Sequence, residues 1–303
     1  MFLSLFLLFY AIIVAGMNIP AGIALLLATM SSASISIVLR LFRASDNNRY
    51  AMILGNYLTC TLVGFLLIPD KSLLFSAHPV TYICGIAGGF LYVLSLVCMQ
   101  KSVMQSGAIL SSAFSKLGLL VPLLMSILFF HEQPSLLQGA GLLLVLTSIY
   151  LISKDDTSAR KEDIHLWFLL VVLFTNGLSD CMAKIYSVNG IRDEESVYVF
   201  FIFFWASIFT FFLLLWERKR TGKSASFRDL AGGILVGIPN YFSSILLLSS
   251  LRVIPAFIAY PVFSTGAIVF VTVISIPLFK EYLNKYQVTA LCLILGALVV
   301  LNI

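Results

Sequence analysis

The chain has 303 residues, of which 60% are hydrophobic and 11% are charged, with a net charge of +5. Soluble domains carry about 25% charged residues, so this composition excludes a water-soluble globular protein and predicts an all-α, polytopic membrane protein. The positive charge is typical of basic cytoplasmic loops in such proteins, and no nucleic-acid-binding motif accompanies it. The five cysteines are scattered through apolar stretches without metal or redox spacing, so we expect no metal or other cofactor.

Residues 1–17 form an apolar segment of their own. They lack the basic start of a signal peptide, and residues 14–16 make a poor cleavage site. Three interpretations stay open: an additional helix, an extension of the next helix past Pro20, and a true start of translation at Met17. The last two together are favoured over a signal peptide.

Beyond this segment, apolar runs recur with only short polar breaks. A helix needs about 20 apolar residues to cross a bilayer. We therefore expect ten membrane helices, near residues 18–42, 50–69, 79–102, 107–130, 134–153, 164–187, 196–216, 229–251, 254–279 and 285–303. A polar loop at 154–163 separates a first five-helix repeat, 18–153, from a second, 164–303.

A constant offset of 149 residues relates the two repeats. It places Phe114 on Phe263 and Glu132 on Glu281, and further upstream it places Tyr92 on Tyr241. An offset held over some sixty residues indicates an internal duplication. Because each repeat has an odd number of helices, the second copy enters the membrane in the opposite sense, which predicts two inverted five-helix repeats.

The distribution of positive charge predicts the orientation. By our count about fourteen of the 19 Lys and Arg residues lie in or beside the loops after the odd-numbered helices, most densely at 217–229. The positive-inside rule places these loops in the cytoplasm. With ten helices it leaves the C-terminus outside.

The turn before the last helix of each repeat contains a Glu, and a characteristic set of residues lies in and around this turn. They are Pro122, Glu132 and Gln138-Gly139 in the first copy, and Glu281, Gln287 and Val288 in the second, where Val288 replaces the glycine that the family prefers. This pattern, over residues 18–303, resembles the drug/metabolite transporter superfamily of the EamA type. The resemblance implies a ten-helix bundle with a substrate cavity between its inverted halves. It also implies cytoplasmic termini, in conflict with the charge distribution.

Ionisable residues inside the predicted helices are the first candidates for a site. A charge at the bilayer centre costs about 2.5–3.5 kcal/mol on insertion scales and so indicates function. Lys116 lies in the middle of the fourth helix. Asp180 and Lys184 lie four apart in the sixth helix and share one face, which Asn176 extends by a turn. An ion pair between Asp180 and Lys184, with Lys184 reaching the interface, is the alternative reading.

Further polar residues extend this set. An offset of 144 matches Ser32 and Ser36 with Asn176 and Asp180, although close helix packing is the favoured role of the serines. Candidates for orienting a solute are Tyr92, Asn240 and Tyr241, for which a structural hydrogen bond is the alternative. Glu132 and Glu281 are expected to cap the N-terminus of the helix that follows each of them.

These residues and the resemblance predict a transporter of the bacterial cytoplasmic membrane, not an enzyme. A small metabolite such as an amino acid or an amphipathic drug would move, outward in the favoured reading, by alternating access of the two repeats. No P-loop is present, so a gradient would drive transport, with Asp180 as the proton-coupling candidate; an uncoupled facilitator fits equally. The protein could act as a monomer or homodimer. A flippase for a lipid-linked carrier and, less favoured, a lipid-modifying enzyme are the alternatives.

Overall fold

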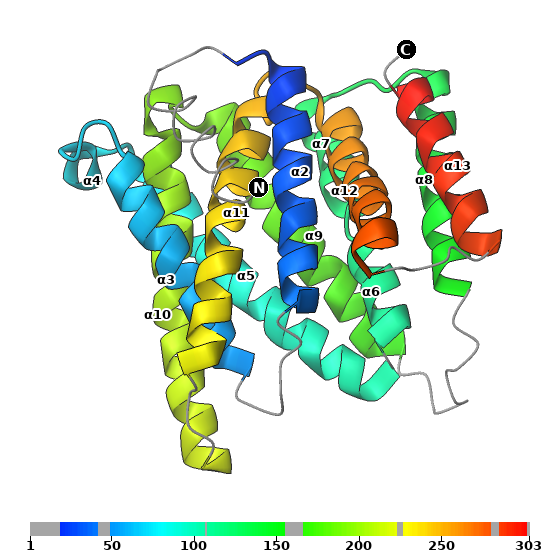
Figure 1. The fold of residues 1–303 in the computed structure, drawn as a ribbon. Coiled ribbons are helices and arrows are strands. Elements are labelled where there is room, and N and C mark those ends of the chain that lie inside the picture. The colour runs from blue at the N-terminus through cyan, green and yellow to red at the C-terminus, as the bar shows by residue number, and fades with distance from the viewer. Residues whose placement is uncertain are drawn as a thin grey trace. The chain divides into compact units, whose positions relative to one another are not determined.

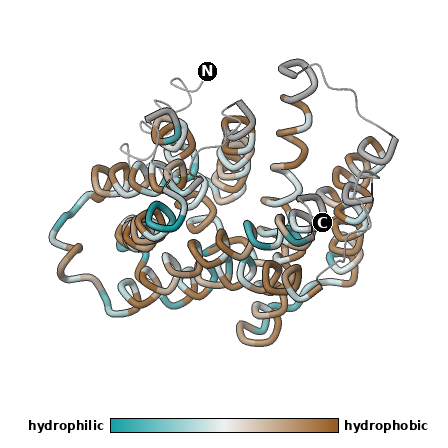
Figure 2. The backbone as a smooth tube through the Cα atoms, turned by 90° about the horizontal axis from the view of Figure 1, so that it is seen from below, coloured by the Kyte–Doolittle hydropathy of each residue, from teal (hydrophilic) through white to brown (hydrophobic). Residues whose placement is uncertain are grey.

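The computed structural model describes residues 19–41, 49–106, 108–154, 166–222, 227–279 and 285–301 (Figure 1). The segment 1–17, nearly all of the loop 154–163, and Glu281 lie outside these ranges. Within them all regular structure is helical, and hydrophobic residues line most of each helix (Figure 2). The prediction of an all-α fold is confirmed.

The helices follow the predicted order. Their bounds are α2 Ala21–Leu41, α3 Arg49–Leu67, α4 Leu73–Ser76, α5 Pro79–Ser106, α6 Ala108–Leu117, α7 Leu120–Phe130, α8 Leu136–Lys154, α9 Leu166–Asn189, the 3-10 turn η1 Arg192–Glu194, α10 Glu195–Thr221, α11 Phe227–Leu251, α12 Ala256–Phe279 and α13 Lys285–Leu301. Within the described ranges, seven of these helices are long and apolar enough to cross a membrane. The inverted relation of the two repeats stays a prediction.

The fourth predicted helix, 107–130, is not continuous. It is interrupted at Gly118 and Leu119, which separate α6 from α7. At the interruption the N–H of Gly118 is shared between the carbonyl oxygens of Phe114 and Ser115, at 3.2 and 3.1 Å. Pro122 has no N–H to continue the hydrogen-bond ladder back to Gly118. The sequence therefore predicted the right segment but missed the break inside it.

The chain forms two compact units, each of which draws on both halves of the sequence. Unit 1 comprises Met1–Val93 and Ile185–Arg252, and unit 2 comprises Leu94–Lys184 and Val253–Ile303. Helices α5 and α9 each continue from one unit into the other. This spatial division differs from the division into sequence repeats.

Unit 1 contains a close packing of α3 against α11. A Cβ atom placed on Gly233 would lie 2.2 Å from the carbonyl oxygen of Met52, and one on Gly237 would lie 2.6 Å from that of Asn56. Only glycine permits such an approach, as is common between membrane helices. The approach brings the Cys60 thiol within 3.1 Å of the Gly237 carbonyl, to which it donates.

An aromatic cluster on α10 packs the same unit from another side. The ring of Phe203 lies 6.0 Å from that of Tyr57 and 5.9 Å from that of Tyr92, measured between centroids. The ring of Tyr241 lies 6.4 Å from Phe203. These contacts join α3, α5 and α11 around one buried phenylalanine.

Unit 2 packs α8 against α13 and α6, and α12 against α7, α8 and α13. Ser102 on α5 and Ser111 on α6 share a buried hydrogen bond of 2.7 Å between their hydroxyls. The interrupted helix α6–α7 packs against α9 in this unit, and that contact contains the candidate site.

Candidate functional site

Lys116 lies in the last turn of α6, directly before the interruption. Broken helices at membrane depth are tolerated where the freed backbone groups are buried in protein or line a cavity, and transporters place solute sites at such breaks. The negative end of the α6 dipole favours a cation at this position. At the interruption the backbone makes a tighter turn, in which the N–H of Leu119 donates to the Lys116 carbonyl at 3.3 Å and the N–H of Val121 donates to the Gly118 carbonyl at 3.0 Å.

Helix α9 approaches the interruption through a pair of glycines. A Cβ atom on Gly118 would lie 2.9 Å from the carbonyl oxygen of Leu173, and one on Gly177 would lie 2.5 Å from the carbonyl oxygen of Gly118. This close approach sets the two backbones against each other without a side chain between them. It places the α9 stripe of Asn176 and Asp180 beside the break.

Within this arrangement Lys116 and Asp180 lie close enough for their opposite charges to interact. Both side chains are half-buried. The hydroxyl of Tyr260 on α12 donates to the backbone carbonyl of Asp180 at 2.6 Å and so fixes this turn of α9. The amide of Asn176 donates to the carbonyl of Val172 at 2.9 Å, within its own helix. The structure therefore brings three predicted residues together in unit 2.

Lys184 has a different partner from the one proposed from the sequence. Its ammonium lies 2.6 Å from Oε1 of Glu132, and the two side chains are 6% and 13% exposed. The ammonium also lies 5.7 Å from the ring centroid of Phe130. The spacing of four residues suggested Asp180, but the turn after α7 supplies a carboxylate that no local pattern could reveal.

The expected role of Glu132 needs a similar correction. Its carboxylate accepts from the N–H of Ala256, at 3.2 and 3.0 Å, and so caps the distant helix α12 instead of the following helix α8. Helix α8 has a capping box of its own: the N–H of Ser135 donates to Gln138, and the N–H of Gln138 donates to the Ser135 hydroxyl. Glu132 is therefore available to join α12 to α9.

The other predicted residues lie in unit 1. Asn240 donates from its amide to Oδ1 of Asn56 at 3.1 Å, as the structural interpretation proposed. Tyr241 is 1% exposed and packs its ring against Phe203 and Phe242. Tyr92 is half-buried against Phe203, while Ser32 is half-buried and Ser36 exposed on α2. A common role of these five with the three residues of unit 2 stays a prediction.

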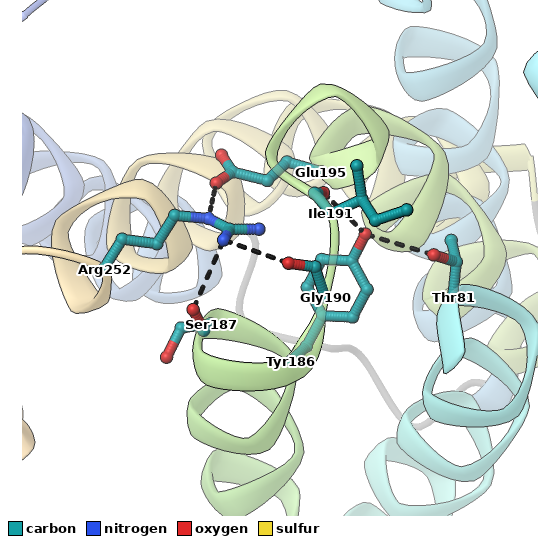
Figure 3. A network of polar contacts seen from close by, with 7 residues as sticks. All are labelled: Thr81, Tyr186, Ser187, Gly190, Ile191, Glu195 and Arg252. Carbon is teal, nitrogen blue, oxygen red and sulfur yellow. Dashed lines mark hydrogen bonds and ion pairs between the residues drawn. The ribbon is translucent and has the colours of Figure 1, made fainter. Parts of the chain in front are cut away.

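A buried polar network that the sequence did not predict closes one end of unit 1 (Figure 3). Arg252, at the end of α11, binds Glu195 through Nε and donates from Nη1 to the carbonyls of Ser187 and Gly190, at 3.3 and 3.2 Å. Arg252 was not among the site residues predicted from the sequence. The only signal was its place between a helix end and Pro255, opposite the acidic start of α10.

A second carboxylate continues the network. Glu194 accepts from the N–H of His78, at 3.1 and 3.0 Å, and from the hydroxyl of Thr81. The Tyr186 hydroxyl lies 3.2 Å from that of Thr81 and donates to the carbonyl of Ile191, at 3.2 Å. The carboxylate thus caps the N-terminus of α5, where the helix dipole favours negative charge.

The chain is similar to known proteins in sequence and in fold. Residues 219–294 match the family model of the Small Multidrug Resistance protein. An uncharacterized protein of Haemophilus influenzae is 26% identical over 273 residues, covering 86% of this chain and 91% of its own length. A solved structure, titled only as the crystal structure of a protein, has a TM-score of 0.73 at 13% identity, covers 93% of this chain and 96% of its own, and shows likeness of fold alone. The chain is an integral membrane protein with seven candidate membrane spans among its described residues, and its residues 219–294 match a Small Multidrug Resistance domain of the drug/metabolite transporter superfamily.

Proposed function

We propose that the protein is a secondary transporter that exports small zwitterionic or amphipathic metabolites, such as amino acids, by alternating access. The observation that carries this proposal is the interrupted helix α6–α7, whose first segment holds Lys116 in its last turn, within electrostatic reach of Asp180 on α9. A cation and a carboxylate inside the membrane cost free energy unless they pair with each other or with a solute. Their placement at a helix break is the arrangement that transporter sites use.

The chemistry of the pair indicates the solute. In the absence of solute, Lys116 and Asp180 partly neutralise each other. A zwitterion offers a carboxylate to Lys116 and an ammonium to Asp180, so its entry replaces one charge pair by two and leaves no group unpaired. Asn176, one turn before Asp180 on α9, adds an amide to the same stripe.

Asp180 is also the residue to which we assign proton coupling. Asp180 can hold either a solute ammonium or a proton, so binding of one displaces the other and the movements of solute and proton are linked at this carboxylate. Two contacts join α9 to α12: the Tyr260 hydrogen bond to the Asp180 carbonyl, and Glu132, which binds both Lys184 and the N–H of Ala256. Through these contacts a change at Asp180 is transmitted to α12. In an uncoupled facilitator Asp180 would bind the solute and would carry no proton.

Counterflow in proteoliposomes tests the proposal. Vesicles preloaded with amino acids, cationic drugs, sugars or lipid-linked sugars would each be assayed for exchange with a labelled member of the same class. We expect exchange with the amino acids, abolished in Lys116→Met. The matched control is Lys101→Met, which removes an exposed lysine of the same unit. Exchange of every class unaffected by Lys116→Met would refute the assigned site, and exchange of lipid-linked sugars alone would favour a flippase.

A further inference from the structure

The C-terminal end of α10 presents three consecutive cations. Arg218, Lys219 and Arg220 occupy the last turn of the helix, and all three are exposed. The turn ends at Gly222, which has a left-handed backbone with φ +69° and closes the helix with its N–H on the Arg218 carbonyl, at 2.9 Å. Positive side chains are favoured beside the free carbonyls of a helix C-terminus. The cations therefore lie on ordered helix.

The length of α10 places this turn at the level of lipid headgroups. The helix has 27 residues, which at 1.5 Å per residue gives about 40 Å, whereas the hydrocarbon core is about 30 Å thick. Its first residue, Glu195, is held by the polar network at the opposite end of unit 1. The excess length of about 10 Å therefore belongs to the basic end.

Towards the end of α10 the exposed side chains change from apolar to charged. Phe212 is 62% exposed and Trp216, one turn later, is 55% exposed. The guanidinium of Arg220 lies 5.4 Å from the centroid of the Trp216 ring. Tryptophan concentrates at the membrane–water interface, and an arginine over its ring is oriented by the cation–π contact. The nearest described acid, Glu217, lies in the same turn, within electrostatic reach of Tyr50 on α3.

We propose that this surface, defined by Trp216, Arg218, Lys219 and Arg220, binds the phosphate headgroups of anionic phospholipids. Arginine matches phosphate oxygens with paired donors, and Trp216 sets the depth at which those donors meet the headgroup. Charge complementarity selects an anionic lipid over a zwitterionic one, whose own ammonium competes for the phosphate. The surface lies outside the solute site and serves to anchor α10 in one leaflet.

Quenching of a single tryptophan tests this surface in the full-length protein. Replacing Trp167 and Trp205 by Phe leaves Trp216 as the one remaining tryptophan of three. The protein would be reconstituted in equal parts of phosphatidylglycerol and phosphatidylcholine, with bromine atoms on one lipid or the other. We expect brominated phosphatidylglycerol to quench Trp216 about twofold more than brominated phosphatidylcholine, and less so at about 0.5 M salt.

Two variants make the result specific. In Arg218→Gln/Lys219→Gln/Arg220→Gln the ratio of the two quenching values should fall to about one, because the charge that selects the lipid is gone. Lys71→Gln/Arg192→Gln removes two exposed cations that follow the even-numbered predicted helices 50–69 and 164–187, whose loops the positive-inside rule leaves on the side opposite the cytoplasm. This variant should leave the ratio unchanged. Equal quenching by both lipids in the parent protein, or a ratio that survives the triple change in a variant of unaltered elution and thermal unfolding, would overturn the proposal.

Discussion

The two units solve the same structural problem with different numbers of residues. In unit 2 a single carboxylate, Glu132, both caps the N-terminus of α12 and forms the ion pair with Lys184. In unit 1 the two tasks are divided between neighbours: Glu194 caps α5, and Glu195 binds Arg252. Both capped helices begin beside a proline, Pro79 or Pro255. A single carboxylate couples helix capping to charge neutralisation. With two carboxylates, a mutation can remove one of these functions and leave the other intact.

The largest effect is expected where one residue has both tasks. Glu132→Gln removes the carboxylate charge that lies 2.6 Å from the buried ammonium of Lys184. Loss of one partner of a buried ion pair typically costs about 3–5 kcal/mol, although the amide oxygen can still accept from Ala256. Thermal unfolding of the purified protein in detergent measures the loss.

The matched variant is Glu132→Gln/Lys184→Met, which removes the ammonium of the pair as well. It should recover most of the stability, because a buried pair replaced on both sides is nearly neutral. A double variant as unstable as the single one would show that the ion pair is not the reason for the loss.

In unit 1 the two tasks should separate. Glu195→Gln strands the guanidinium of Arg252 and should cost about 3 kcal/mol. Glu194→Gln keeps one acceptor for His78 or Thr81 and should cost about 1–2 kcal/mol. Unfolding of each variant, under the conditions used for Glu132→Gln, ranks them. Equal losses, or a larger loss for Glu194→Gln, would contradict the division of tasks.

The glycine contact at the helix break gives the next effect. Gly177→Ala places a methyl group 2.5 Å from the Gly118 carbonyl and from the Val121 side chain, so α9 must shift, at about 1–3 kcal/mol. Gly139→Ala is the control, because a Cβ there meets nothing within 4 Å. Equal stability of the two variants in thermal unfolding would contradict the close approach of α9 to the break.

The sequence predicted most of the helices because apolar runs of membrane length are a local property. It also predicted Lys116 and Asp180 from the cost of intramembrane charge. The break at Gly118 was missed since glycine is common in intact membrane helices. The partners of Lys184 and Arg252 were missed for another reason: Glu132 and Glu195 lie far away along the chain, and only folding brings these charges together.

The smallest effect concerns Asp70, an exposed residue of the α3–α4 connection. The side chain of Ser72 and its backbone N–H, 2.9 Å from Oδ1, stabilise the carboxylate and lower its pKa below the usual value. A lowered pKa in the folded state contributes stability above the unfolded pKa and loses it as the pH falls through the folded one. Ser72→Ala should raise the pKa of Asp70, as a carboxyl carbon NMR titration would show. An unchanged titration would mean that the Ser72 hydroxyl has no part in it.

The most direct test of the transport site uses solutes that lack one charge. In counterflow, Lys116→Met should lose the intact amino acid yet accept the corresponding amine without a carboxylate. Asp180→Asn should show the reverse preference, for the acid without an ammonium. Opposite selectivity in the two variants is the result expected if these side chains bind opposite ends of one solute. The same residual preference in both, whichever solute it favours, would contradict that assignment.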